Sequence, residues 1–382
     1  MQACLEYWND GNNQKTTRFF DKAIDVFNQD FIDVLRISDF NTTGLTGSDK
    51  DYNSAWQNLV KSSGVSNKGG TSGGSFGIGK SAPFACSDLR TVFYSTIDNQ
   101  GLKAFQGIAR LVSFKKKKFI GDDPTTTGIG YYGVKEKNSA IRECISITND
   151  FTRKDVGTDV FILGFSKKSD WKDEIIISVL DDFLYSVYNN KLIVKVDGII
   201  SKDTLKFTVT QYADKASKAY NYYLVLNDES TKHINYHMDK VGTIDLYVLI
   251  KPNLHRQMMM CRTNGMKVYD QKSISANIHF AGICILNDDG INQYFREMEN
   301  PQHNAWEPER HSQPSDAKKR KKELTKYIKD QVLSIGRITT VDEMDAEGAG
   351  EYLADIAFQD TNNQDNAESV SNKTKISKYW SL

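Results

Sequence analysis

One stretch of the chain constrains its fold more than any other: residues 62–79, which are polar and rich in glycine. The stretch contains seven glycines: Gly64, Gly69, Gly70, Gly73, Gly74, Gly77 and Gly79. Glycine destabilises the interior of helices and strands, so a run of this density predicts a loop. Residues 80–88 follow directly and are predicted to form a helix.

A glycine-rich loop that leads into a helix is suited to binding phosphate. Glycines let backbone N–H groups approach an anion closely, and the first helical turn adds unpaired donors and a partial positive charge. Lys80 adds a point charge at the start of the predicted helix. The alternative is a flexible surface linker, which would not normally carry Phe76 and Ile78 between its glycines.

The same segment has a superficial match to the P-loop pattern, GSFGIGKS at residues 74–81. A P-loop follows a buried strand directly, whereas residues 62–71 are polar. The sequence therefore favours a phosphate-binding loop of another kind.

Two further segments offer groups that suit the base of a nucleotide. Asp39 follows a predicted strand, residues 31–38, and presents a carboxylate to an adenine amino group. The glycine and threonines of ISDFNTTGL leave space for a flat base, and Thr158, in VGTDVF, offers a hydroxyl to the same pocket. Together the segments favour an adenine nucleotide as the ligand.

The remaining pattern mixes helices and strands in two blocks. In the first block, apolar spacing predicts a helix at residues 16–28 and strands at 89–96, 104–114 and 159–164. In the second, we expect a helix at 175–188 and strands at 191–196, 243–250 and 276–285. A basic helix is expected at 316–335, ahead of an acidic, polar and poorly ordered tail. We therefore predict domains at residues 1–167, 168–315 and 316–382.

Composition indicates a folded, soluble and cytoplasmic protein. Lys and Arg number 49 and so do Asp and Glu, which argues against a surface built as a whole to hold nucleic acid. No run approaches the roughly 18 apolar residues of a membrane span, and the N-terminus lacks the pattern of a secretory signal, so no membrane partner is expected. Five cysteines without a CxxC pair predict reduced thiols.

The ordered set Asp39…Gly44, GSFGIGK and Gly157-Thr158 resembles the GHKL ATPases. That superfamily includes type II topoisomerase ATPase subunits of the gyrase B kind, MutL proteins, heat-shock chaperones, histidine kinases and MORC proteins. The resemblance covers roughly residues 1–165 and is especially close to the chaperone and MORC branches. It implies an α/β (α+β) fold class: a Bergerat-type α/β sandwich that binds ATP and Mg²⁺, followed by a sheet-plus-helix transducer-like domain.

The resemblance also implies roles for individual residues. Asp39 would bind the adenine amino group, and Thr158 would support water on the adenine side. The base pocket would be shaped by Asn41, Thr43 and Gly44. Residues 62–79 would form the ATP lid. The last part of the lid and the lysine after it would hold the nucleotide: Gly74, Ser75, Phe76, Gly77, Ile78, Gly79 and Lys80. One departure is that DFNTTGL has one residue more before its glycine than the family pattern DxGxG.

The first motif of the family, a helical Glu-x-x-x-Asn-x-x-Asp, does not fit the start MQACLEYWND in a single way. One register places Ala3 and Glu6 at the Asn and Asp positions, so that the catalytic base would precede residue 1. The other makes Glu6 the base with Asn9 or Asp10 near the metal, at a spacing of three rather than four. The first is slightly preferred and implies ATP binding with little or no hydrolysis.

In gyrase-type and MutL-type relatives a basic residue of the transducer reaches the γ-phosphate. MCRTNGMKV, residues 260–268, offers Arg262 and Lys267 for that role, although a surface turn with solvated charges is the favoured interpretation.

The leading functional hypothesis is an ATPase switch. ATP would order the lid, change the angle between the blocks and pair two chains as a homodimer, with an output in DNA handling or bacterial defence. DNA or a partner protein is accordingly a candidate partner. The alternative is a nucleotide-binding, chaperone-like interaction module with little or no hydrolysis.

Overall fold

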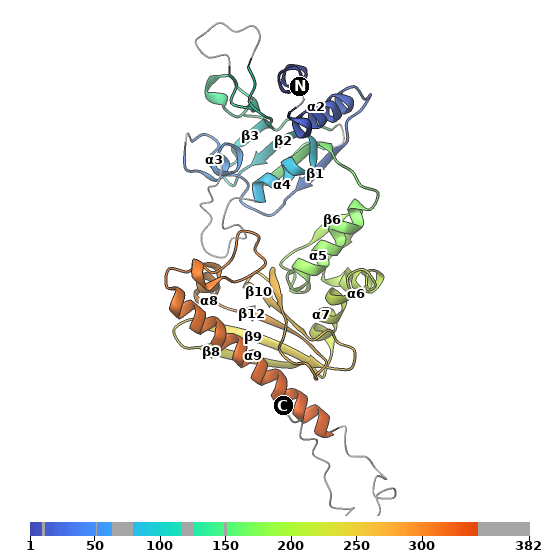
Figure 1. Cartoon of the computed structure of the whole chain (residues 1–382), viewed down its shortest axis with the longest axis vertical. Coiled ribbons are helices and arrows are strands. Elements are labelled where there is room, and N and C mark those ends of the chain that lie inside the picture. The colour runs from blue at the N-terminus through green and yellow to red at the C-terminus, as the bar shows by residue number, and fades with distance from the viewer. Residues whose placement is uncertain (10–11, 51, 63–78, 116–124, 149–150, 343–382) are drawn as a thin grey trace, which may run out of the picture. The chain divides into compact units, whose positions relative to one another are not determined.

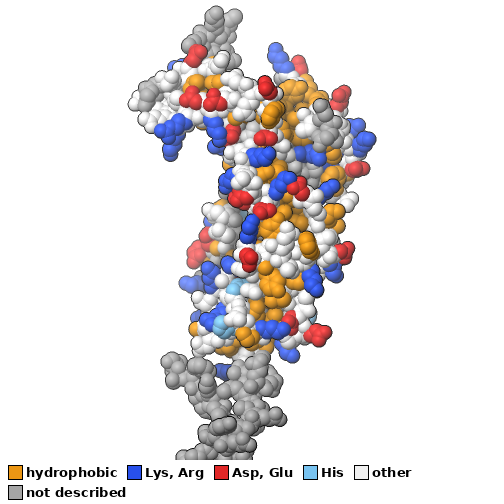
Figure 2. All heavy atoms as spheres, turned by 90° about the vertical axis from the view of Figure 1, so that its right-hand side faces the viewer, with side chains coloured by type: hydrophobic (Ala, Val, Ile, Leu, Met, Phe, Trp, Pro, Cys, Tyr) orange, Lys and Arg blue, Asp and Glu red, His pale blue; other side chains and the backbone are white. Residues whose placement is uncertain are grey.

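The computed structural model describes residues 1–9, 12–50, 52–62, 79–115, 125–148 and 151–342 (Figure 1). The chain forms two compact units, Met1–Glu174 and Ile175–Leu382. Both combine helices with a mainly antiparallel sheet, so the expected mixed α/β (α+β) fold class is confirmed. On the face drawn in Figure 2, acidic and basic side chains are interspersed.

The first unit is built on a five-stranded antiparallel sheet in the order β1-β5-β2-β3-β4. Its strands are β1 (Val34–Ser38), β2 (Ser87–Ile97), β3 (Lys103–Arg110), β4 (Ile129–Tyr132) and β5 (Gly157–Phe165). The register pairs Ser38 with Asp159 and Thr96 with Thr158. The end of β1 therefore lies beside the start of β5 and the end of β2, although more than 50 residues separate each pair in sequence.

The helices of this unit are α1 (Gln2–Trp8), α2 (Gln14–Phe27), α3 (Ala55–Val60) and α4 (Ala82–Ala85), with short 3₁₀ turns η1 (Gly79–Ser81) and η2 (Glu136–Asn138). Alternate residues of a strand point to one face, so Val92 and Tyr94 of β2 share a face with Ile108 of β3. Trp56 of α3 and Phe84 of α4 pack on that face and complete a buried core.

The second unit contains a five-stranded sheet in the order β11-β10-β12-β9-β8, in which only the β10–β12 pair is parallel. Its strands are β8 (Lys232–Met238), β9 (Gly242–Ile250), β10 (Gln257–Cys261), β11 (Lys267–Gln271) and β12 (Phe280–Leu286). A separate hairpin consists of β6 (Val194–Val196) and β7 (Gly198–Ile200). The helices are α5 (Trp171–Tyr188), α6 (Lys202–Gln211), α7 (Ser217–Asn227), α8 (Asp289–Arg296) and α9 (Pro314–Asp342), with a 3₁₀ turn η3 (Pro308–Arg310).

Helices cover both faces of this second sheet, as the apolar strand β12 shows. Phe280, Cys284 and Leu286 join a core that includes side chains of α8 and α9. Ala281, Ile283 and Ile285 point the other way, into a core with α5, α6 and α7. Because β12 is buried on both faces, its sequence is continuously apolar and does not alternate between polar and apolar residues.

Several predicted elements are present with shifted ends. The helix expected at 16–28 is α2, and the basic helix expected at 316–335 extends over Pro314–Asp342. The helix expected at 80–88 is wrong at its end, because β2 begins at Ser87. The Ser87 hydroxyl accepts hydrogen bonds from the N–H groups of Leu89 at 3.2 Å and Thr91 at 3.1 Å, which turns the chain into the strand. Among the described residues, no helix is long and apolar enough to span a bilayer.

Candidate nucleotide-binding site

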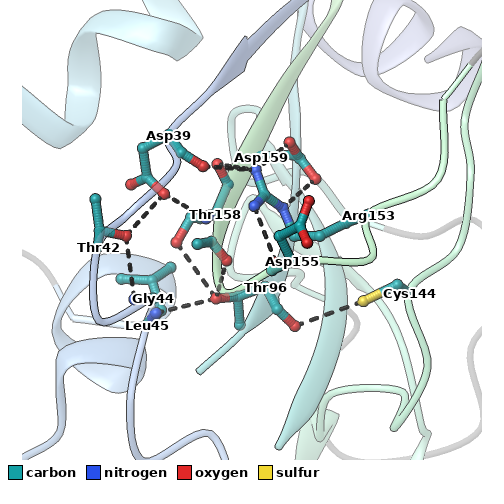
Figure 3. A network of polar contacts seen from close by, with 11 residues as sticks. Asp39, Thr42, Gly44, Leu45, Thr96, Cys144, Arg153, Asp155, Thr158 and Asp159 are labelled. Atoms are coloured by element: carbon teal, nitrogen blue, oxygen red, sulfur yellow. Dashed lines mark hydrogen bonds and ion pairs between the residues drawn. The ribbon is translucent and has the colours of Figure 1, made fainter. Parts of the chain in front are cut away.

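Asp39 stands directly after β1 and is held against the start of β5 (Figure 3). Its N–H donates to the Thr158 carbonyl at 2.9 Å, and the Thr158 N–H donates to Asp39 Oδ1 at 2.6 Å. The Thr42 hydroxyl donates to the same carboxylate oxygen at 3.0 Å. The carboxylate is therefore fixed from two directions, by the sheet and by its own loop.

Thr96, at the end of β2, fastens the Asp39 loop to the sheet (Figure 3). Its side chain is fully buried, and its hydroxyl donates to the Gly157 carbonyl at 2.9 Å. The same oxygen accepts from the N–H of Leu45 at 3.0 Å and lies 3.3 Å from the Thr158 hydroxyl. One buried hydroxyl thus joins three segments that are distant in sequence.

A buried ion pair lies beneath this network. Arg153 and Asp159 have side-chain exposures of 0% and 1%, and the guanidinium donates to both carboxylate oxygens at 2.7 Å. The same guanidinium donates to the carbonyl of Asp39 at 2.9 Å and to that of Thr158 at 3.0 Å. Two-point pairing of a planar guanidinium with a carboxylate fixes its orientation. Arg153 is therefore a positioning residue for the backbone on which the candidate site is built.

Two glycines are required by the close approach of neighbouring backbone. Gly157 has φ +142°, and a Cβ there would lie 2.4 Å from the Asp39 carbonyl oxygen. Gly44 has φ +62°, and its Cβ would lie 2.4 Å from the Ile97 carbonyl oxygen. Both conformations are unfavourable for other residues, and both contacts are with backbone that has no rotamer to change.

The second oxygen of the Asp39 carboxylate, Oδ2, accepts no hydrogen bond from the residues that the structure describes. Asp39 is exposed, as are Asn41 and Thr43 beside it, whereas Thr158 is buried. The Thr43 carbonyl accepts from the N–H of Asn99 at 3.0 Å, which holds the loop against the chain that follows β2. The site therefore presents one pre-oriented carboxylate oxygen that can accept a hydrogen bond.

Lys80 lies in η1 on the helical side of the same sheet. Its ammonium donates to the carbonyl of Asn58, in α3, at 2.7 Å. Burial lowers the pKa of Lys80, and the neighbouring Arg110 guanidinium lowers it further. Gly79 precedes it in an open position. Gly74, Ser75, Phe76, Gly77 and Ile78 lie outside the described residues, so the rest of the expected phosphate loop stays a prediction.

Glu6 lies on α1 and Asn9 caps its C-terminal end, both exposed. Within the described residues, neither side chain is a hydrogen-bond partner of Asp39 or Thr158. Within that same part of the chain, no group of three or more His, Cys, Asp or Glu residues could hold a metal ion. The roles of Glu6 and Asn9 stay predictions.

Arg262 and Lys267, the candidate γ-phosphate sensors, both have acidic partners inside the second unit. Arg262 follows β10 and is buried with Glu299, to which its Nε donates at 2.8 Å and its second terminal nitrogen donates as well. Lys267 lies 3.4 Å from a carboxylate oxygen of Asp182. A sensor role for either residue stays a prediction.

Sequence reasoning missed Arg153, Asp159 and Thr96, although one signal was present. Asp159 is a carboxylate within the apolar run DVFILG, where a charge needs a buried partner. Arg153 is six positions upstream in sequence and supplies that partner. Thr96 gave no comparable signal, because a threonine in a strand is ordinary.

No family model matches the chain, and no curated protein matches it. Among solved structures, it is similar to the B-subunit of the DNA gyrase from Myxococcus xanthus, with 9% identity, a TM-score of 0.38 and coverage of 78% of this chain and 80% of that one. It is also similar to the 43K ATPase domain of Thermus thermophilus gyrase B in complex with an aminocoumarin, with 10% identity, a TM-score of 0.30 and coverage of 88% and 92%.

Proposed function

We propose that the first unit binds an adenine nucleotide and that Asp39 recognises its base. The observation that carries the proposal is the Asp39 carboxylate, one oxygen of which is fixed by the Thr158 N–H at 2.6 Å and the Thr42 hydroxyl at 3.0 Å. Its other oxygen accepts nothing from the described residues, and an exocyclic amine is the donor that suits it.

The same geometry gives the site a basis for choosing between bases. Adenine presents an amino group where guanine presents a carbonyl oxygen. A carboxylate accepts from the former and repels the latter, because ionised Asp has no hydrogen to donate. A site that leaves a buried or oriented polar group unpaired with the wrong ligand rejects that ligand strongly.

Isothermal titration calorimetry with ATP, GTP and the variant Asp39→Asn tests the proposal. We expect ATP to bind the parent protein at least tenfold more tightly than GTP, because a hydrogen bond to a charged group contributes about 1.5–3 kcal/mol. Asp39→Asn should lose most of that preference, since an amide can both donate and accept. Asp33→Asn, an exposed carboxylate just before β1, is the matched control and should bind ATP like the parent. Equal ATP affinity in Asp39→Asn would contradict the base-pocket assignment.

We further propose that this nucleotide site drives an ATPase switch with Mg²⁺ as cofactor, in which the lid orders and two chains pair. Glu6 would act as the base, and Asn9 would contribute an amide to a metal held mainly by phosphate oxygens. Glu6→Gln should abolish phosphate release while leaving ATP affinity within a factor of two. Undiminished release would exclude Glu6 as the base. No release from the parent protein would favour the alternative, a chaperone-like binding module without turnover.

We propose that the second unit has a transducer-like role and transmits the conformational change of the switch. The proposed domain limits are 168–315 for the transducer-like domain and 316–382 for the C-terminal part. Arg262 or Lys267 would then sense the γ-phosphate. The basic helix α9 would be the element that meets DNA phosphates or a partner protein. Size-exclusion chromatography with a non-hydrolysable ATP analogue tests the pairing: we expect a dimer with the analogue and a monomer with ADP.

A further inference from the structure

A cleft, called here the cation cleft, lies at the opposite end of the first sheet from Asp39. It has a volume of about 380 Å³ and is formed by α2, α4 and the outer ends of β2 and β3. Its charged lining consists of Lys15, Arg90 and Arg110. Its apolar lining includes Phe19 and Phe84, and its hydroxyl groups come from Thr16 and Ser81. Among the residues that the structure describes, the lining contains no acidic side chain.

The three cations of this cleft have no acidic partner among the residues that the structure describes. Lys22, on the same helix as Lys15, differs in that it pairs with Asp88 at 2.8 Å. Three positive side chains that converge without a counter-charge repel one another, and an anion between them removes that cost.

Aromatic rings hold the two guanidinium groups in place. The Arg110 guanidinium lies 4.3 Å from the centre of the Phe84 ring, and that of Arg90 lies 5.9 Å from the centre of the Phe19 ring. Arg110 also donates to the Ser81 hydroxyl at 3.3 Å. A guanidinium has five N–H donors, so both arginines keep donors for a ligand while their planes are held by the rings.

Register separates this cleft from the Asp39 site. Thr96 pairs with Ala104 of β3, and Arg110 is six residues further along the same strand. At about 3.3 Å per residue, Arg110 is roughly 20 Å from the position beside Thr96. The two sites therefore contact different parts of one ligand or bind different ligands.

We propose that this cleft binds the phosphate group of a small molecule other than the nucleotide held by Asp39. Guanidinium groups match phosphate oxygens in pairs, and serine and threonine hydroxyls add donors. The volume is within the range of small-molecule sites and can take a phosphate with a small organic group. The proposal is independent of adenine recognition.

Calorimetric titration of the full chain with pyrophosphate tests this site. The parent protein should bind pyrophosphate, and Lys15→Ala, Arg90→Ala and Arg110→Ala should each weaken binding about tenfold or more. Lys103→Ala, an exposed cation at the other end of β3, is the matched control and should change the affinity less than twofold. The Lys15 side chain is exposed, so Lys15→Ala is expected to fold normally. This variant therefore tests the site even if the arginine variants misfold.

Asp39→Asn separates this proposal from the proposed function. It should lose ATP affinity and keep pyrophosphate affinity, whereas Arg110→Ala should do the reverse. Pyrophosphate binding that is absent in the parent, or unchanged in all three cleft variants, would overturn the proposal. Loss of ATP and pyrophosphate together in Arg110→Ala would also overturn it, as would displacement of pyrophosphate by a DNA duplex.

Discussion

The two five-stranded sheets differ in how many polar side chains they bury. In the first sheet, β2, β3 and β5 bury six polar side chains: Ser87, Ser95, Thr96, Gln106, Thr158 and Asp159. In the second, β8 to β12 bury no Ser, Thr, Asn, Gln or charged side chain within the described part of the chain. The second sheet is built for packing between helices, whereas the first accepts the cost of buried polar groups, four of which (Ser95, Thr96, Thr158 and Asp159) lie at the end that holds Asp39.

Burial of polar groups without hydrogen-bond partners destabilises a fold by several kcal/mol, so the presence of buried polar groups in the first sheet calls for an explanation. The first sheet limits this cost by pairing Arg153 with Asp159 and by sharing the Thr96 hydroxyl among three segments. A buried ion pair adds little net stability compared with apolar residues of similar volume. We infer that the polar end of the first sheet is retained for the geometry that it gives to Asp39.

The largest effect that we expect comes from Arg153→Met. Removal of one partner leaves Asp159 charged and buried, which should lower the free energy of unfolding of the first unit by about 3–5 kcal/mol. ATP affinity should fall as well, because the Asp39 carbonyl loses a donor. Urea unfolding followed by hydrogen exchange at β5 measures the first effect, and calorimetry the second.

The double variant Arg153→Met/Asp159→Leu sharpens this prediction. It should recover most of the lost stability, because no charge is left unpaired, and it should still bind ATP weakly. Full recovery of ATP affinity in the double variant would show that the ion pair serves stability alone.

Ile283→Ala is the corresponding change in the second sheet. Ile283 is fully buried on β12, so its truncation should lower the free energy of unfolding of the second unit by about 2–5 kcal/mol. ATP and pyrophosphate affinities should stay within a factor of two of the parent values. If Ile283→Ala lost as much ATP affinity as Arg153→Met, the claim that only the first sheet supports the nucleotide site would be contradicted.

A change in pH is expected to have a smaller effect on the stability of the second unit. Burial lowers the pKa of His255 from 6.5 to about 4, with Lys218 acting in the same direction and Asp270 against it. Its Nδ1 lies 2.8 Å from the Asn221 amide nitrogen, and its Nε2 is buried without a partner among the described residues. The folded state thus holds His255 neutral, while the unfolded state takes up a proton below pH 6.5.

Stability of the second unit should therefore be complete above pH 6.5 and decrease as the pH falls towards about 4. We expect a loss on the order of 2 kcal/mol, discounted for the partial exposure of the ring. His255→Asn should flatten this dependence, and urea unfolding at pH 7.5 and pH 4.5 measures it. An equal slope in the variant would assign the dependence to other groups.

Sequence predicts local features of this molecule well and long-range ones poorly. Apolar spacing predicted α2 and the change to a basic composition predicted α9, while polar and small residues next to predicted strands singled out Asp39, Gly44 and Thr158 as candidates. Arg153 was not found because TRKD is a hydrophilic sequence that looks solvated until the fold buries it. The bounds of strand β10 were not predicted, because its run QMMMC is almost fully buried and shows no alternation of polar and apolar residues.

The cation cleft illustrates the same limit. Lys15, Arg90 and Arg110 are isolated in sequence, and only the antiparallel pairing of β2 with β3 and the packing of α2 bring them together. No spacing rule predicts such a site, because its members come from three separate elements.

The most direct test of the central claim is an amide spectrum of the isotope-labelled full chain during titration with ATP. The account predicts that the N–H signal of Thr158, which donates to the Asp39 carboxylate, shifts saturably with ATP and stays in place with pyrophosphate. Saturable ATP binding that leaves the Thr158 and Thr42 signals unmoved would contradict the claim that Asp39 holds the base.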